Sequence, residues 1–314
     1  MINYLKLIRT QNLLIIAATM FLTRYCILLP IIELNDLSPG FNLFQFSLLV
    51  LGIMLIAGAG YAINDYFDAK IDFINKPKKI LVGVKIKRRV AMATQIVFNT
   101  VGVIIGGFLS FKIKDYSLVT LFVMSTLTLG LYSFILKRKL FIGNLAIAIL
   151  AGVIPFVAVF YETKIITQNN LELFIQYNFD LNIVLIYALG YSGFAFLTNL
   201  AREIIKDIED IKGDKINGRN TVPIVYGVVN TKYFITAILL VIMGLLGFIN
   251  WQQFIFEEYI SFGYFIVFVQ LPLIFLIYNL WTTKEATQYR LTGNILKFIM
   301  LFGIMSMIVF KYTL

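Results

Sequence analysis

Three aspartates follow a long apolar run near the N-terminal quarter of the chain. Leu48–Ile63 is almost entirely apolar, and the next residues include Asn64, Asp65, Asp68 and Asp72. At a helical period the three aspartates share one face. Clustered carboxylates beside hydrocarbon repel one another and are costly to desolvate, so they require a counter-charge. Their oxygen ligands favour a hard divalent cation such as Mg²⁺.

A second acidic segment repeats this spacing later in the chain. Asp207, Asp210 and Asp214 follow another apolar run, and Glu203 extends their face back toward that run. Identical spacing after two apolar runs indicates two copies of one functional element. We therefore expect the two aspartate triads to face each other across one site.

Basic residues interleave with both acidic segments and indicate a polyanionic ligand. These residues are Lys70, Lys76, Arg202 and Lys206. Mg²⁺ commonly takes one or two carboxylates together with substrate phosphates, and cations stabilise the charge of a departing diphosphate. Since the site opens into a hydrocarbon-filled bundle, the other end of the ligand should be apolar. An isoprenyl diphosphate meets both requirements.

The composition identifies the element that must position these residues as a membrane bundle. The 314 residues are 60% hydrophobic and only 14% charged, whereas a soluble domain carries about 25% charged residues. Apolar runs of the length needed to cross a bilayer, about 20 residues, predict an all-α polytopic membrane protein with nine transmembrane helices. The expected spans are about 12–34, 43–63, 90–111, 116–136, 141–160, 182–203, 232–250, 261–281 and 293–312. The second and sixth are expected to continue as helix into the acidic segments.

The spans suggest a single transmembrane domain, residues 1–314, built from two four-helix repeats plus one helix. The repeat halves would be about 12–136 and 141–281, with the extra helix at about 293–312. The long segment around Tyr161–Asp180 has no acidic triad and is interpreted as a connecting loop.

The distribution of the 27 Lys and Arg residues predicts the orientation. Most fall on the side that also carries the N-terminus and both acidic segments, and such residues mark the cytoplasmic side. We therefore expect a multi-pass protein of the cell (plasma) membrane, with the N-terminus and the site on the cytoplasmic side. The net charge of +10 reflects this asymmetry, and no nucleic-acid partner is expected. Three roles remain open for Arg24, which lies inside the first span: to snorkel, to pair with an outer acid or to line the cavity.

Histidine and disulfide chemistry are absent from the sequence. The chain has no His and one Cys, Cys26, so it forms no intrachain disulfide and no disulfide partner is expected. Acid–base and metal chemistry must then use carboxylates, Tyr, Ser, Lys or Arg.

The two acidic motifs resemble those of the UbiA superfamily of intramembrane prenyltransferases. The matching patterns are Asn64-Asp65-x-x-Asp68-x-x-x-Asp72 with Asn75-Lys76-Pro77 after it, and Asp210-x-x-x-Asp214. The segment Arg202–Asp214 is most similar to the branch that makes digeranylgeranylglyceryl phosphate. The resemblance covers nearly the whole chain and implies Mg²⁺-dependent transfer of an isoprenyl, here geranylgeranyl, group from its diphosphate to a prenylglyceryl phosphate, forming an ether lipid. The partners would be the isoprenyl diphosphate, a membrane-embedded acceptor and the lipid bilayer.

The resemblance also implies roles for individual residues. Metal ligands would be Asp65, Asp68, Asp72, Asp207, Asp210 and Asp214. Substrate-binding residues would be Arg9, Asn12, Asn64, Lys70, Lys137 and Lys206. Catalytic residues would be Tyr132 and Ser133, near the reacting centre, with Glu203 or Asp207 receiving the proton released by the acceptor.

Two other functions remain open at this point. One is an aromatic prenyltransferase of quinone biosynthesis, with 4-hydroxybenzoate or dihydroxynaphthoate as acceptor. A phosphate-bearing glycerol needs more cations than an aromatic carboxylate, and the many basic residues near the site favour the glycerol. The other is a cation transporter, which predicts acids deep within the spans rather than gathered at one face.

Overall fold

Long helices make up the protein, and the computed structural model describes residues 2–75, 80–176, 180–285 and 288–313, apart from the side chains of Lys70 and Asp72. No strand occurs in these ranges. Nine helical segments of the described chain are long and apolar enough to cross a membrane. This confirms the predicted all-helical, multi-pass membrane fold.

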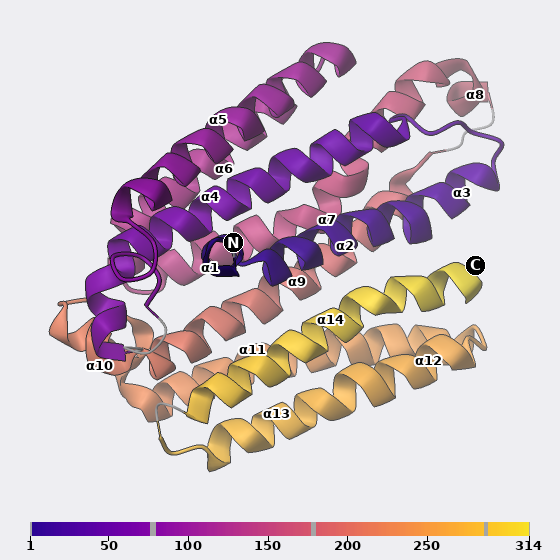
Figure 1. The fold of residues 1–314 in the computed structure, drawn as a ribbon. Helices are drawn as coiled ribbons and strands as arrows, with labels where there is room; N and C mark the ends of the chain where they lie inside the picture. Colours follow the sequence, from indigo (N-terminus) through magenta and orange to yellow (C-terminus); the bar gives the residue numbers. More distant parts are fainter. Residues whose placement is uncertain (1, 76–79, 177–179, 286–287, 314) are drawn as a thin grey trace.

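The N-terminal half of the chain is folded into the following elements (Figure 1). They are α1 (Ile2–Leu7), α2 (Thr10–Thr23), the π-helical turn η1 (Arg24–Leu28), α3 (Leu29–Glu33), α4 (Leu43–Asn75), α5 (Arg88–Ile113), α6 (Ser117–Phe134), the 3₁₀ turn η3 (Leu136–Arg138) and α7 (Ile142–Asn169). The second predicted span indeed continues as helix through the first acidic segment, because α4 ends only at Asn75.

The C-terminal half contains the remaining elements. They are α8 (Leu171–Gln176), α9 (Asn182–Glu209), α10 (Ile211–Ile216), α11 (Val222–Ile255), α12 (Tyr259–Phe265), the π-helical turn η4 (Ile266–Gln270), α13 (Leu271–Thr282) and α14 (Tyr289–Thr313). Helix α9 carries the second acidic segment as far as Glu209, as predicted. Helix α11 begins at Val222, earlier than the predicted span, and contains a kink at Gly227, whose φ is 80°.

One expectation was wrong: the described residues of the segment Tyr161–Asp180 are mostly helical and do not form a loop. Helix α7 continues to Asn169, and Tyr161, Glu162 and Thr163 are buried in it. The polar residues that lower the hydropathy there are tolerated because the Glu162 carboxylate accepts hydrogen bonds from Arg24 at 2.9 Å. Arg24 therefore pairs with an acid, one of the three roles left open for it.

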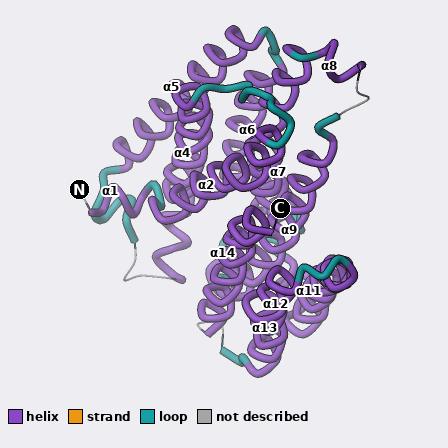
Figure 2. Tube along the Cα trace, turned by 90° about the vertical axis from the view of Figure 1, so that its right-hand side faces the viewer, coloured by secondary structure: helices purple, strands orange, loops and turns teal. Residues whose placement is uncertain are grey.

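The bundle has two flanks and a central group of helices. Figures 1 and 2 show α4, α5 and α6 on one flank and α11, α12 and α13 on the other, with α2, α7, α9 and α14 between them. Helix α7 packs along α9 and helix α14 packs against both α2 and α9. The predicted division into two four-helix repeats stays a prediction.

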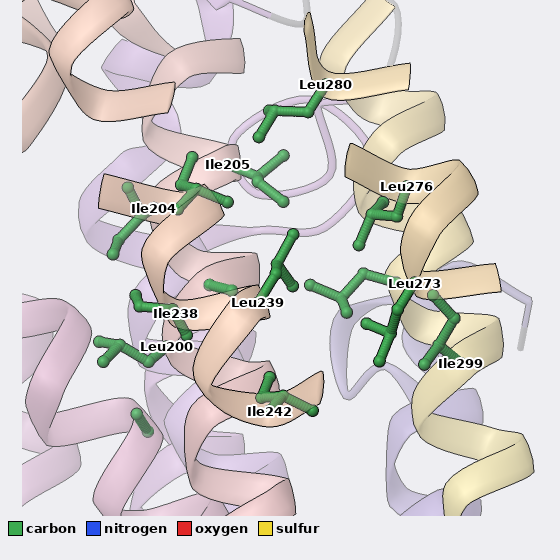
Figure 3. Close-up of a cluster of buried hydrophobic side chains, with 14 of the residues drawn as sticks. Leu200, Ile204, Ile205, Ile238, Leu239, Ile242, Leu273, Leu276, Leu280 and Ile299 are labelled. Atoms are coloured by element: carbon green, nitrogen blue, oxygen red, sulfur yellow. The ribbon is translucent and has the colours of Figure 1, made fainter. Parts of the chain in front are cut away.

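Separate apolar clusters hold the two flanks. On one side Phe46, Leu49 and Phe122 join α4 to α6. On the other, Ile204, Leu239 and Leu276 join α9, α11 and α13, and Ile299 of α14 completes the same cluster (Figure 3). Because each flank has its own core, the central helices are free to carry polar side chains between them.

Both acidic segments lie at the same end of the bundle, which we call the motif end. Helices α4 and α9 end there, beside the short α10 (Figure 1). The opposite end, called the far end, holds α3, α8 and the C-terminus.

Candidate functional site

A polar cavity at the motif end brings the two acidic segments together. Its lining includes five aspartates: Asp65, Asp68, Asp207, Asp210 and Asp214. The cavity has about 950 Å³ of empty space, open solvent included. We call it the carboxylate cavity. The expectation that the two motifs face one site is met by the geometry of these described side chains.

The first motif uses one face of α4. Asp68 follows Asn64 by four residues and Asp65 by three, so it shares a helix face with each, and all three side chains line the cavity. Asp65 accepts a hydrogen bond from Arg9 Nη2 at 3.0 Å. Asp68 accepts one from Lys137 Nζ at 2.7 Å, and Lys137 also donates to the Asn64 side-chain oxygen at 3.3 Å.

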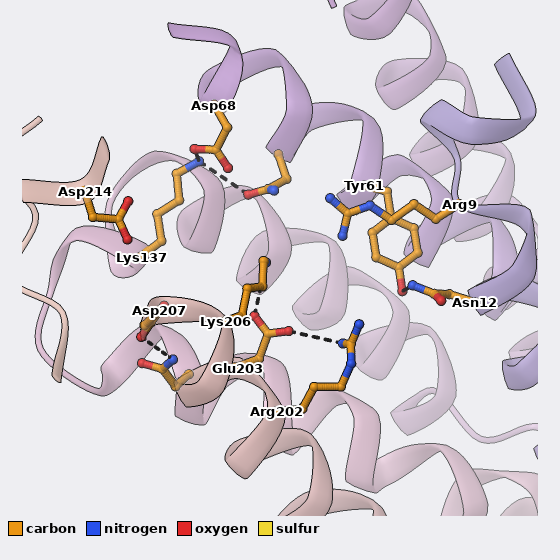
Figure 4. Close-up of polar contacts among 12 residues, drawn as sticks. Arg9, Asn12, Tyr61, Asp68, Lys137, Arg202, Glu203, Lys206, Asp207 and Asp214 are labelled. Atoms are coloured by element: carbon orange, nitrogen blue, oxygen red, sulfur yellow. Dashed lines mark hydrogen bonds and ion pairs between the residues drawn. The ribbon is translucent and has the colours of Figure 1, made fainter. Parts of the chain in front are cut away.

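The second motif combines the end of α9 with α10. Asp207 Oδ2 accepts a hydrogen bond from Asn144 Nδ2 of α7 at 2.8 Å. Asp214 Oδ1 accepts one from Arg219 Nη1 at 3.0 Å. Glu203, one turn before Asp207, lies 3.5 Å from Arg202 and 3.4 Å from Lys206 (Figure 4).

Two side chains join the motifs directly. Arg219 donates to Asp214 of the second motif and, through Nη2, to Asp68 of the first. Asn75, at the end of α4, donates from Nδ2 to the Asp210 backbone carbonyl at 3.0 Å and accepts from the Gly213 backbone N–H at 2.8 Å. A Cβ at Gly213 would lie 2.5 Å from the Asn75 side chain, so glycine permits this close approach.

The charged side chains of the cavity are partly removed from water, and acids and bases among them partly neutralise one another. Burial raises the pKa of Asp214 to about 6, although Arg219 acts in the opposite direction. Burial also lowers the pKa of Lys137, against the effect of Asp68. Because burial makes each of these groups costly to charge, a bound ligand of opposite charge stabilises its charged form.

Mg²⁺ fits the chemistry of this donor set. Five carboxylates and the amides of Asn64 and Asn144 present hard oxygen ligands to one cavity. Among the side chains that the structure describes, no three acidic groups are grouped closely enough to form a metal site by themselves. Instead, Lys137 and Arg219 both contact Oδ1 of Asp68.

Two apolar pockets follow the carboxylate cavity in series: the first shares lining residues with the cavity, and the second shares lining residues with the first. The first, which we call the α4–α7 pocket, shares Asn64 and Tyr132 with the carboxylate cavity. Its apolar lining includes Ile53, Ile56, Leu129 and Ile154. The second, the α2–α14 pocket, is lined by Ile15, Phe194, Met300 and Ile304 among others. They have about 940 and 860 Å³ of empty space, respectively. The site thus combines a charged chamber with two apolar chambers.

The predicted residues outside the aspartates are distributed between these chambers. Arg9, Lys137 and Lys206 line the carboxylate cavity, and Tyr132 lines both it and the α4–α7 pocket. Asn12 lies farther in, where it donates to the Tyr61 hydroxyl at 3.3 Å and accepts from Lys297 Nζ at 2.8 Å.

Three predicted positions are less informative. Ser133 is buried and does not line these chambers, so its catalytic role stays a prediction. The side chains of Lys70 and Asp72 lie outside the described part of the chain, as do residues Lys76 and Pro77 of the first motif.

Arg219 and Asn144 were missed when the sequence alone was read. Asn144 is a polar residue near the start of an otherwise apolar span, and that contrast is a usable signal. Arg219 is one of several basic residues after the second motif and has no distinguishing spacing. Only the fold shows that it contacts both motifs.

Comparisons with known proteins give a consistent result. The model of the UbiA prenyltransferase family matches residues 37–302. A protein of Methanosphaera stadtmanae named digeranylgeranylglyceryl phosphate synthase is 32% identical over 256 residues, which cover 79% of this chain and 83% of that one.

Solved structures show the same fold. A structure described as concerning digeranylgeranylglyceryl phosphate synthase in membranes is 24% identical, covers 99% of this chain and 98% of that chain, and has a TM-score of 0.62. A UbiA homologue of Archaeoglobus fulgidus bound to DMAPP and Mg²⁺ is 15% identical, covers 98% of this chain and 99% of that chain, and has a TM-score of 0.55.

Proposed function

This chain belongs to the UbiA prenyltransferase family, and we propose that it transfers a geranylgeranyl group from its diphosphate to a prenylglyceryl phosphate, with Mg²⁺ as cofactor. The observation that carries the proposal is the carboxylate cavity, which is continuous with the α4–α7 pocket through shared lining residues, while that pocket is in turn continuous with the α2–α14 pocket. One reaction that joins two lipid chains requires both pockets. The name of the relative from Methanosphaera stadtmanae favours the same acceptor.

The described residues suggest how each part of the donor is held. The aspartates of both motifs would hold Mg²⁺, which neutralises a diphosphate and makes it a better leaving group. Lys137, Arg219 and Lys206 line the same cavity and bind the phosphate oxygens as charge develops on them. The apolar chain enters the α4–α7 pocket, which meets the carboxylate cavity at Asn64 and Tyr132.

Transfer is a substitution at C1 of the allylic chain. The C1–O bond breaks and its electron pair leaves with the diphosphate, while an acceptor hydroxyl oxygen forms a new bond to C1. The Tyr132 ring, at the boundary of the two chambers, stabilises the developing allylic cation by about 0.5–2 kcal/mol. The hydroxyl proton passes to Glu203 or Asp207, and from there to the diphosphate.

We also propose the orientation and extent of the unit. The motif end faces the cytoplasm and the protein resides in the plasma membrane, because Lys and Arg residues gather on the motif side. Residues 1–314 act as a single domain. These proposals place a water-soluble leaving group, the diphosphate, in the compartment where it is released.

Purified protein in lipid nanodiscs tests the function. With Mg²⁺ and geranylgeranyl diphosphate, we expect ether product with geranylgeranylglyceryl phosphate, and no product with 4-hydroxybenzoate or dihydroxynaphthoate. Chelation of Mg²⁺ and the variant Asp210→Asn should each abolish product. The matched variant Asp36→Asn, at an exposed far-end position whose φ of 55° asparagine also tolerates, should retain it. Product with an aromatic acceptor alone would replace the proposal by the quinone reaction.

A further inference from the structure

A second polar chamber lies beside the carboxylate cavity, between α9 and α14. It is lined by the charged residues Arg9, Arg202, Lys206, Glu209 and Arg290 and has about 760 Å³ of empty space, open solvent included. We call it the arginine pocket. Arg290 lines none of the three other chambers.

The charges in the arginine pocket favour an anion. Four cations and one carboxylate occur among the described residues that line it. Glu209 forms a two-point ion pair with Arg290, at 2.9 Å from Nε and 2.7 Å from Nη2. Arg9 is neutralised by Asp65. Arg202 and Lys206 both lie near the Glu203 carboxylate, at 3.5 and 3.4 Å, so the cations that line the pocket outnumber the carboxylates with which they form ion pairs.

These cations are accessible to a ligand. The side chains of Arg202, Lys206 and Arg290 retain 31, 33 and 42% of their full exposure. Guanidinium groups present planar pairs of donors that match phosphate oxygens. Unlike the carboxylate cavity, the arginine pocket has cations in excess, so a single phosphate requires no metal ion to enter it.

The neighbouring chambers define what is attached to that phosphate. Arg202 also lines both apolar pockets, and Lys297, about two turns after Arg290 on α14, lines the α2–α14 pocket. Arg9 and Lys206 line both the arginine pocket and the carboxylate cavity. A ligand with its anion here can therefore place one chain between α2 and α14 and still present a neighbouring group to the carboxylate cavity.

We propose that Arg202 and Arg290 bind the phosphate monoester of the acceptor lipid, and that the acceptor's chain lies in the α2–α14 pocket. This assignment rests on the proposed function and adds to it a second anion subsite, separate from the one that holds the diphosphate. The two substrates differ in charge and in metal affinity. Separate subsites keep the two headgroups in a fixed order, with only the glycerol hydroxyl between them.

The variants Arg202→Gln and Arg290→Gln test the subsite through a difference between acceptors. Loss of a hydrogen bond to a charged group costs enough to raise KM for geranylgeranylglyceryl phosphate about 10- to 100-fold. KM for geranylgeranyl diphosphate should stay within about twofold, since the diphosphate contacts are elsewhere. With geranylgeranylglycerol, which lacks the phosphate, variants and wild type should have the same KM.

Two further variants serve as controls. Arg89→Gln removes an exposed basic residue at the start of α5 that lines none of the four chambers, and should behave as wild type. Arg290→Lys keeps the charge without the planar donors and should give an intermediate KM. It also provides a folded comparison if Arg290→Gln proves unstable.

A binding measurement separates this inference from the proposed function. Thermal unfolding is followed with geranylgeranylglyceryl phosphate alone, without donor, so that no reaction is needed. We expect the lipid phosphate to raise the Tm of wild type and not that of Arg202→Gln. If the wild type binds in this way but forms no ether, the subsite stands and the proposed reaction falls. If ether forms and both Gln variants match wild-type KM, or raise KM for both acceptors alike, the subsite falls and the reaction stands.

Discussion

Buried charge is handled differently in the two ends of this bundle. At the far end, Arg24 donates to both oxygens of Glu162 at 2.9 Å and to the Phe41 carbonyl at 2.6 Å, while the Phe41 N–H donates to Glu162 at 3.2 Å. Both side chains are almost fully buried, at 4 and 0% exposure. At the motif end, Asp68 and its neighbours line an open cavity.

The difference lies in how completely the charges are satisfied by the protein itself. The Arg24 guanidinium has three hydrogen bonds and lies 4.6 Å from the Phe46 ring centroid, so little is left for a ligand. The aspartates of the motif end are held at their edges by Lys137, Arg219 and Asn144 and still face free space. A closed pair stabilises a fold, and an open set of charges binds a substrate.

The strongest test of the comparison is Arg24→Met. It leaves the buried Glu162 carboxylate without its partner, and breaking such a pair costs about 3–5 kcal/mol. Chemical or thermal unfolding in detergent should show this loss. Transfer per folded molecule should remain close to wild type, because Arg24 lines none of the four chambers of the site.

The double variant Arg24→Met, Glu162→Leu sharpens the same point. Replacing both partners by apolar groups of similar volume is often neutral or stabilising by about 1–4 kcal/mol, so much of the lost stability should return. If the double variant folds well and is inactive, the pair has a functional role and the comparison fails.

Asp68→Asn is the counterpart at the motif end. The substitution keeps the shape but removes the negative charge that Lys137 and Arg219 contact. Removing one charge-stabilising group from an active site lowers kcat about 10²–10³-fold. Initial rates at saturating substrates measure this, and unfolding should show a smaller loss of stability than for Arg24→Met. Equal losses of stability in the two variants would mean that Asp68 is also a structural residue.

The nine spans and both acidic faces could be predicted from the sequence because they depend on local periodicity. The helical period sets which residues share a face, so the spacing of Asp65 and Asp68 is enough to predict that their side chains lie on the same side of the helix. Apolar runs of sufficient length give helices in a membrane regardless of their partners. Tyr132 and Lys137, by contrast, were identified through a family resemblance and have no local signal of their own.

Pairings between distant segments could not be predicted. The segment around Tyr161–Asp180, which contains Glu162, was interpreted as a connecting loop, and the burial of Glu162 becomes favourable through its contact with Arg24. Arg219 likewise reaches Asp68 across 151 positions of sequence. Such contacts are set by how helices pack, and no spacing rule along one helix encodes them.

Asn75→Ala probes how the two motifs are kept in register. The Asn75 side chain joins α4 to Asp210 and Gly213 through two hydrogen bonds. Without them the motifs lose their fixed separation, and small misplacements of reacting groups lower the reaction rate strongly. We expect kcat to fall about tenfold, which corresponds to about 1.4 kcal/mol.

The matched control for this change lies at the other end of the same helix. Asn42 accepts a hydrogen bond from the Gln45 backbone N–H at 2.9 Å, as an N-terminal cap of α4. Asn42→Ala should cost about 1 kcal/mol of stability and leave kcat unchanged. If both variants lower kcat alike, helix stability rather than motif register limits the reaction.

Asp115→Asn is expected to have the smallest effect, although Asp115 has the short contact of a good ion pair. Its Oδ2 lies 2.6 Å from Lys164 Nζ, but Lys164 is 46% exposed, and exposed pairs contribute about 0.2–1 kcal/mol.

The hydrogen bond from Lys164, followed by that from Ser117, lowers the pKa of Asp115 from 3.8 to about 2. The pair therefore stabilises the fold above pH 3.8 and loses its effect as the pH falls through about 2. The Tm difference between wild type and Asp115→Asn should accordingly be small at pH 7 and vanish toward pH 2. A loss comparable to that of Arg24→Met at pH 7 would show that exposure does not decide the strength of charge pairs at the far end.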